Sequence, residues 1–410
     1  MMESLCNTIL DTLQQPHPDD PIRACGKSVL QLLTIRPKDL IQLAHDKLHA
    51  YPFKEVPTCW RRLYTDASIA EAVLEITAKG KNTGEDWQGG VVKTLDMALI
   101  MTGAPLRGQM IEQLVSALQS STSERPSKRQ KLEDVYTQEA LEPPELRHPL
   151  PHACLSMAAF EAHLSSPTPL ILKDALTHWP ALEERPWKSP SYLLEKTFGG
   201  RRLVPIELGR SYTDEGWGQS IITFSEFLDR YLINKDNTVG YLAQHDLFSQ
   251  IPSLRNDISI PDYCYTSPPP PPSGTPLAGK EISELEEPLI NAWFGPAGTL
   301  SPLHTDPYHN ILCQIVGSKY VRLYSPFESD KVYPRGSEEG GVDMGNTSRV
   351  DIRAIENGED NETQKNYPLF DKAKFVEGIL NEGECLYIPV GWWHYVRSLT
   401  VSFSVSFWWN

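Results

Sequence analysis

Apolar positions recur at helical spacing through the first part of the chain. Leu5, Ile9 and Leu13 repeat every four residues, which places their side chains on one face of an amphipathic helix. Further runs of this kind fall at 40–48, 70–76, 95–101 and 111–118. We therefore expect residues 1–118 to form an all-helical domain.

From about residue 148 the pattern changes to short apolar runs separated by connections rich in proline, threonine and glycine. The last run is the clearest, because Val401, Phe403, Val405 and Phe407 alternate with serines. A period of two marks a strand with one apolar face and one small polar face. The other strand-like runs are 169–172, 203–208, 289–294, 311–315, 320–324 and 384–389. Residues 148–410 are expected to form a mainly β domain, so the fold class is α+β.

Between these two parts, residues 119–147 are polar, charged and poor in large apolar side chains. Such a segment buries too little apolar surface to offset the entropy of ordering it, so we predict a flexible linker. Its basic cluster, Lys128, Arg129 and Lys131, is typical of a nuclear-import signal and equally of a solvated linker. We expect the protein in the nucleus, with the cytoplasm as a second location.

The chain of 410 residues carries a formal net charge of −15. A dedicated nucleic-acid-binding protein would show a basic stripe, so we expect no direct nucleic-acid binding. The negative charge suits a basic protein partner, and equally a surface that is merely acidic and soluble. The seven cysteines are scattered without a CxxC pair, which is typical of reduced thiols rather than of a disulfide framework or a zinc site. No run reaches the roughly 20 apolar residues of a membrane span, so no membrane association is expected.

Chemistry is concentrated in the stretch SPLHTDPYHN, residues 301–310. His304 and Asp306 are separated by one residue, so on an extended segment their side chains leave the same face. His394, in IPVGWWHYV, supplies a third candidate ligand 88 residues after Asp306. Two imidazoles and one carboxylate on one face of an octahedral ion form the facial triad of non-haem Fe(II) oxygenases. An isolated HxD pair is more often an ordinary loop, so the triad depends on its neighbours in the sequence.

One such neighbour is Lys319, which lies 15 residues beyond His304 in the apolar stretch QIVGSKYVRLYSP. A lysine between Val316 and Val321 is costly to bury unless an anion pairs with it. The distal carboxylate of 2-oxoglutarate would be a suitable partner. The same sequence would also suit a lysine at a strand edge whose ammonium group reaches solvent.

These segments together resemble the Jumonji-C family of oxygenases, and within it the lysine-specific demethylase 8 group. The resemblance rests on NAWFGPAGTLSPLHTDPYHNILCQIVGSKYVRLYSP and GECLYIPVGWWHYVRSLTVSFSVSFWWN. It covers residues 150–410 closely and extends, less distinctively, to the helical part. It implies a double-stranded β-helix, a cupin-like Jumonji-C barrel with Fe(II) in its mouth.

The resemblance also implies roles for individual residues. His304, Asp306 and His394 match the metal ligands of the family and are therefore the expected catalytic residues. The positions that match the binding residues for the co-substrate 2-oxoglutarate are Tyr241, Ser301, Asn310 and Lys319. An oxygenase of this kind uses O2 and 2-oxoglutarate, and the protein supplies binding, orientation and exclusion of water.

The substrate is less well defined by the sequence. VPIELGRSYTDEGWGQ, residues 204–219, resembles the family segment that lines the substrate cleft, and Glu207, Tyr212 and Trp217 would form an acidic and aromatic wall there. The family group is associated with hydroxylation of protein arginine at C-3 and with demethylation of methyl-lysine in histone H3. We favour arginine, because a carboxylate binds guanidinium in a bidentate way. A third possibility is a non-enzymatic cupin that acts as a scaffold through its helical domain.

Overall fold

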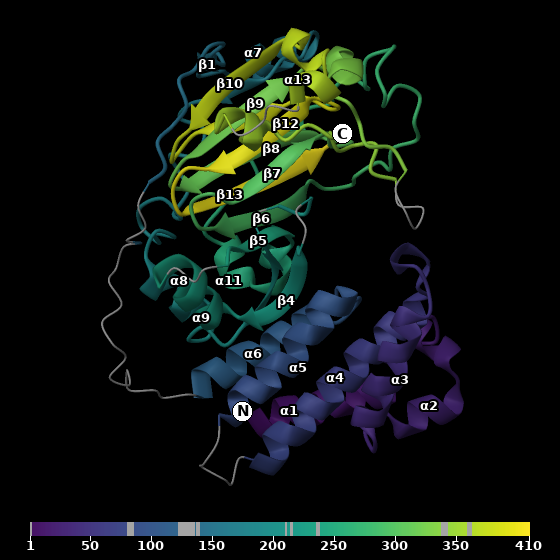
Figure 1. The fold of residues 1–410 in the computed structure, drawn as a ribbon. Helices are drawn as coiled ribbons and strands as arrows, with labels where there is room; N and C mark the ends of the chain where they lie inside the picture. The colour runs from purple at the N-terminus through teal and green to yellow at the C-terminus, as the bar shows by residue number, and fades with distance from the viewer. Residues whose placement is uncertain are drawn as a thin grey trace.

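The computed structural model describes residues 2–79, 86–121, 136, 140–209, 211–213, 216–234, 238–337, 343–358 and 363–410. Within them the chain forms a helical N-terminal part and a β-rich C-terminal part, as Figure 1 shows. This arrangement confirms the predicted α+β class. The helices of the N-terminal part are α1 (Met2–Gln14), α2 (Lys27–Leu32), α3 (Pro37–His49), α4 (Thr58–Lys79), α5 (Trp87–Thr102) and α6 (Gly108–Ser121).

The helical part has its own apolar core, formed by the positions whose period predicted the helices. Ile9, Leu13, Leu40 and Ala44 are all buried in one cluster. Pro37 occupies the first turn of α3, where its missing N–H costs nothing. The expected helical domain is therefore present.

A buried ionic cluster lies within this helical core. Arg62 on α4 contacts Asp20 at 2.9 Å and Asp66 at 2.5 Å, and Arg107 donates to Asp66 at 3.3 Å. Two guanidinium groups and two carboxylates thus form ion pairs with one another away from water. Loss of one partner would leave an uncompensated buried charge, which typically costs about 3–5 kcal/mol.

The β-rich part is built from two sheets. The larger sheet has the strand order β1-β2-β11-β8-β13-β6-β5-β3-β4, and the smaller has the order β10-β9-β12-β7. Apart from the parallel β1–β2 pair, the strand pairs within both sheets are antiparallel. The two facing sheets form the expected cupin-like, double-stranded β-helix (Figure 1).

The strands are β1 (His152–Ala153), β2 (Leu170–Leu172), β3 (Leu203–Leu208), β4 (Gly218–Thr223), β5 (Gly240–His245), β6 (Leu289–Gly295), β7 (Leu300–His304), β8 (His309–Val316), β9 (Lys319–Tyr324), β10 (Phe375–Leu380), β11 (Cys385–Ile388), β12 (Trp393–Ser398) and β13 (Ser402–Trp409). Short helices lie between them: α7 (Met157–Leu164), α8 (Pro190–Lys196), α9 (Phe224–Phe227), α10 (Leu247–Gln250), α11 (Pro252–Arg255), α12 (Ile352–Glu356) and α13 (Thr363–Asn366).

Strand β13 is buried on both faces, so its serine face does not meet solvent. Ser402 and Ser404 bond the amide of Gln314, and Ser406 accepts a hydrogen bond from the indole of Trp293 at 2.9 Å. The alternation predicted the strand correctly. The serine face of that strand can be buried because each hydroxyl has a hydrogen-bond partner there.

The two parts of the molecule are joined by a buried ion pair. Asp96 on α5 receives hydrogen bonds from the Arg202 guanidinium, at 2.7–3.0 Å, and from the backbone N–H of Leu203 at 2.7 Å. Both charged side chains are nearly inaccessible. Phe198 of the β-rich part is buried in the helical core. The helical part is thus packed directly against the start of β3.

The expected linker is only partly described, and its ends are ordered. Helix α6 continues to Ser121, past the predicted boundary at 118. At the other end, Leu141 N–H donates to Leu399 O at 2.7 Å, and Arg147 N–H donates to Glu377 at 2.6 Å. The basic cluster at 128–131 lies outside the described residues. Among the helices that the structure describes, none is long and apolar enough to cross a bilayer.

Candidate functional site

The three candidate metal ligands come from two neighbouring strands of the smaller sheet. His304 is the last residue of β7, and Asp306 follows two positions later. His394 lies near the start of β12, directly opposite His304 in the antiparallel register. Gly391, at φ +75°, supports the turn that leads into β12. The strand pairing therefore brings together His304 and His394, which are 90 positions apart in the sequence.

The ligand atoms of these three side chains lie within 4.8 Å of one another. Asp306 Oδ1 is 3.8 Å from His304 Nε2, and Asp306 Oδ2 is 3.4 Å from His394 Nε2. The two imidazole rings have centroids 4.1 Å apart. One ion can be reached by all three groups, as a facial triad requires.

Backbone carbonyls fix the orientation of both imidazoles. His304 Nδ1–H donates to Pro302 O at 2.7 Å, and His394 Nδ1–H donates to Trp392 O at 2.9 Å. A carbonyl only accepts, so the proton must be on Nδ1 and the lone pair on Nε2. Both Nε2 atoms face Asp306, and this outer-shell arrangement is the one that metal-binding histidines use.

Burial keeps these groups in the charge states that a metal needs. Burial and the neighbouring His394 lower the pKa of His304 to about 4. For Asp306, burial alone would raise the pKa, but the hydrogen bond and charge of His394 outweigh it and lower the pKa. At neutral pH His304 is therefore an uncharged donor and Asp306 an anionic one.

An inner pocket lies behind the triad and is lined by all four predicted co-substrate residues. Lys319 is only 1% exposed, and burial lowers its pKa to about 7. Its Nζ contacts the hydroxyl of Tyr241 at 3.5 Å and forms no ion pair with any residue that the structure describes. Asn310 Oδ1 is also buried without a hydrogen-bond partner. Ser301 completes the polar lining.

This lining fits a small dicarboxylate. A buried ammonium without a counter-charge is strongly destabilised, and a carboxylate placed beside Lys319 would remove the penalty. The hydroxyls of Tyr241 and Ser301 add donors to the same anion. The amide oxygen of Asn310 is buried without a hydrogen-bond partner. With the amide turned over, its NH2 group would donate to the same anion.

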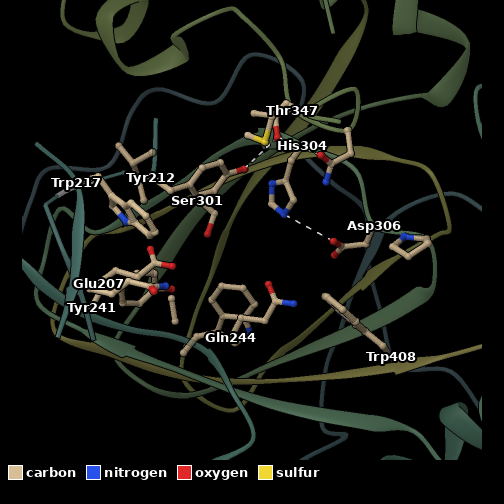
Figure 2. Close-up of a pocket in the computed structure, with 17 residues that line it drawn as sticks. Glu207, Tyr212, Trp217, Tyr241, Gln244, Ser301, His304, Asp306, Thr347 and Trp408 are labelled. Atoms are coloured by element: carbon tan, nitrogen blue, oxygen red, sulfur yellow. Dashed lines mark hydrogen bonds and ion pairs between the residues drawn. The ribbon is translucent and has the colours of Figure 1, made fainter. Parts of the chain in front are cut away.

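An outer cleft of about 680 Å³ opens from the triad and contains the three predicted substrate residues. Figure 2 shows Glu207 and Trp217 on one side of this cleft and His304 and Asp306 on the other. Burial raises the pKa of Glu207, and a hydrogen bond from Trp217 opposes this effect. Burial also raises the pKa of Tyr212 to about 12, so its hydroxyl stays protonated.

The sequence did not reveal the segment that covers one side of the triad. Residues 343–350 run alongside β7: Thr305 N–H donates to Asn346 O and Ser348 N–H donates to Leu303 O, both at 2.8 Å. Thr347 of this segment bonds the hydroxyl of Tyr212 at 3.3 Å (Figure 2). The segment has no apolar period, so no strand could be predicted from it.

Gln244 and Trp408 also line the cleft and were not predicted. Gln244 lies in a bulge of β5 with φ +45°, a conformation that a non-glycine residue adopts rarely. The bulge turns its amide toward the cleft (Figure 2). Nothing in the sequence GYLAQH predicts a positive φ at this glutamine.

Comparison with known proteins assigns both parts of the chain. The cupin-like domain family matches residues 156–410, and the family of KDM8-like N-terminal ARM repeats matches residues 38–133. A lysine-specific demethylase 8 from Danio rerio is 37% identical over 92% of this chain and 87% of its own length. The Xenopus tropicalis protein of that name is 34% identical, over 90% and 87%. The Jumonji C domain-containing protein 5 of Drosophila melanogaster is 35% identical, over 90% and 85%.

Proposed function

Because the chain belongs to the Jumonji-C family of Fe(II)- and 2-oxoglutarate-dependent dioxygenases, we propose that it oxidises a basic side chain of a protein and that this side chain is arginine, at C-3. The observation that carries the proposal is the half-buried carboxylate of Glu207 in the cleft that opens on the triad. The alternative of a non-enzymatic scaffold is not supported, because the family is one of enzymes.

In this proposal His304, Asp306 and His394 hold Fe(II). Lys319 and its polar neighbours, Tyr241, Ser301 and Asn310, hold 2-oxoglutarate. Bound together, the metal and the co-substrate supply the activation of O2 that oxidation of an unreactive C–H bond requires. The protein contributes uncharged Nε2 donors, an anionic carboxylate and a buried cation for the distal carboxylate.

The substrate side chain is held by the wall of the outer cleft. Glu207 accepts hydrogen bonds from a guanidinium, and Trp217 and Tyr212 offer aromatic surface to the same cation. Burial raises the pKa of the Glu207 carboxyl, so a cation bound beside it would stabilise its charged form. The planar fork of arginine matches a carboxylate better than the point charge of lysine does. When the guanidinium is held at Glu207, the position of the arginine side chain relative to the metal is fixed, and with it the carbon that faces the metal.

Demethylation of methyl-lysine is the second candidate, and the names of the Danio rerio and Xenopus tropicalis relatives favour it. The same wall of Glu207, Tyr212 and Trp217 offers an anion and aromatic faces, which suit a methylated ammonium as well. A histone substrate would make the protein a chromatin regulator that acts in the nucleus. Either substrate is a basic protein segment, consistent with a chain of net charge −15.

Mass spectrometry decides between the two reactions. Full-length protein with Fe(II), 2-oxoglutarate and O2 is incubated with matched peptides that carry arginine, lysine or dimethyl-lysine at one position. We expect a gain of one oxygen on arginine and no change on lysine. Loss of a methyl group from dimethyl-lysine, with arginine unchanged, would replace arginyl hydroxylation by demethylation. No change on any peptide, with succinate still formed, would leave the dioxygenase intact and contradict both substrates.

A further inference from the structure

A small pocket lined by three arginines lies beside the substrate cleft. It is lined by Arg335, Arg349 and Arg353 and by the hydroxyl side chains of Ser211 and Thr213; we call it the arginine pocket. Its volume is about 50 Å³. Since a water needs roughly 10–15 Å³ by this measure, the pocket admits a few waters or one group the size of a phosphate or carboxylate.

The arginine pocket shares a wall with the cleft. Leu300 lines both spaces. In the loop 211–213, Tyr212 lines the cleft while its two neighbours line the arginine pocket. The hydrogen bond between Tyr212 and Thr347 therefore lies at the partition between them. A peptide that places one side chain in the cleft has its nearby residues within reach of the arginine pocket.

The arginine pocket is lined by three guanidinium groups and one carboxylate, that of Asp351. Arg349 and Arg353 form no ion pair with any residue that the structure describes. Arg349 donates to the backbone oxygens of Pro334 and Arg335, at 3.4 and 2.6 Å, which orients its guanidinium without neutralising it. The one acidic side chain in the lining, Asp351, already accepts two backbone N–H bonds at the start of α12.

Hydroxyl groups add uncharged donors to this surface. Ser211 and Thr213 bond each other at 2.8 Å, so one of the two hydroxyls keeps a proton for another acceptor. Guanidinium groups combined with a hydroxyl donor are the typical lining of a site for phosphate or carboxylate. A concentration of positive charge is also unexpected by chance in a chain of net charge −15.

We propose that the arginine pocket is a second substrate subsite, which binds an anionic side chain close in sequence to the residue that is oxidised. The anion is a phosphorylated serine or threonine, or an acidic residue; both present oxygens to the same donors. The subsite rests on the proposed function, because it assumes that a peptide occupies the outer cleft. It would restrict the enzyme to sequences in which a cationic and an anionic side chain lie near each other.

Binding measurements on the full-length protein test this subsite separately from the cation site. The protein is kept with Fe(II) and 2-oxoglutarate without O2, so that it binds peptide but does not turn over. Fluorescence anisotropy then compares peptides with central arginine or glutamine, each with serine or phosphoserine at one of the three positions on either side. We expect phosphoserine to strengthen binding at least tenfold at one or two positions, and inorganic phosphate to compete with this gain.

The double variant R349Q/R353Q should lose the gain, while R23Q, in the helical part, should keep it; melting curves check that both variants are folded. The gain should shrink as salt is raised, because it depends on charge. A glutamate peptide identifies the source: an equal gain points to acidic residues, and a gain with phosphoserine alone points to phosphorylation. The subsite is refuted if phosphoserine strengthens binding nowhere, or if the folded double variant keeps the gain.

The two proposals fail in different ways. If the cation site is wrong, central arginine and glutamine bind equally while the gain from phosphoserine remains. If the arginine pocket is wrong, arginine is still preferred and the gain is absent. The factorial set of peptides therefore reports on each site independently.

Discussion

Replacement of Lys319 by methionine should leave the protein at least as stable as the wild type without 2-oxoglutarate, and less stable than the wild type with it. Methionine keeps the length and apolar character of the stem but removes the charge. In the protein without co-substrate, burial lowers the pKa of Lys319 from 10.5 to about 7. At 1.36 kcal/mol per pKa unit, the charged form is destabilised by roughly 5 kcal/mol, as an upper bound. K319M should therefore be at least as stable as the wild type when 2-oxoglutarate is absent.

The sign of the pH dependence follows from the same shift. Between pH 7 and 10.5 the unfolded chain holds a proton on Lys319 that the folded chain releases, so stability rises with pH in this window. The penalty is fully present below pH 7. The comparison at pH 7 is thus the most sensitive, and the advantage of K319M should diminish as the pH approaches 10.

With 2-oxoglutarate bound, the wild type should become more stable than K319M. The wild type gains an ion pair at a buried site, and loss of such a partner costs roughly 2–5 kcal/mol, or about 30-fold and more in affinity. Thermal melting with and without 2-oxoglutarate measures both effects, and the KM from succinate formation provides a second readout. A K319M protein that is clearly less stable without co-substrate, or that keeps the wild-type KM, would refute the assignment of Lys319 to 2-oxoglutarate.

Four further perturbations test other parts of the molecule. Asp306→Ala should abolish succinate formation with little change in melting temperature, and near-normal turnover would contradict the metal assignment. Glu207→Gln should lower arginine oxidation at least tenfold and spare peptide-independent decay of 2-oxoglutarate; normal oxidation would contradict the guanidinium contact. Asp96→Asn weakens the buried pair with Arg202, so urea unfolding should show a loss of up to about 3–5 kcal/mol, and no loss would contradict a tight domain contact. Because the pKa of His304 is about 4, the folded chain binds fewer protons than the unfolded chain between pH 6.5 and 4. The metal-free protein should lose stability across this window, by up to roughly 3 kcal/mol from this residue, and His304→Gln should flatten the slope.

The sequence predicted the strands and the pair of His304 and Asp306 because both depend on local patterns. The predicted run 203–208 coincides with β3, and 289–294 and 320–324 each differ by one residue from their strands. Buried strands have distinctive apolar runs, since both of their faces meet the core. His304 and Asp306 could be paired in advance because one intervening residue on a strand places two side chains on the same face.

Features that depend on contacts between distant segments could not be predicted in this way. The buried pair of Asp96 and Arg202 joins two parts that the composition separates by a linker. Nothing near either residue indicates that its partner lies 106 positions away. Asn346 and Thr347 reach the cleft through hydrogen bonds to β7 and not through an apolar period. Polar backbone pairing of this kind leaves no trace in a hydrophobicity pattern.

The contact between Asp96 and β3 connects the helical part to the proposed substrate wall. Leu203, whose N–H is held by Asp96, begins the strand on which Glu207 lies four residues later. Glu207 is in turn opposite Tyr241 in the register of β3 and β5. The carboxylate that we propose to bind the substrate and the hydroxyl that we propose to border the co-substrate therefore lie on strands anchored by the helical part. A partner that displaced α5 would therefore act on the larger sheet, which carries Glu207, whereas His304 and His394 lie on strands of the smaller sheet.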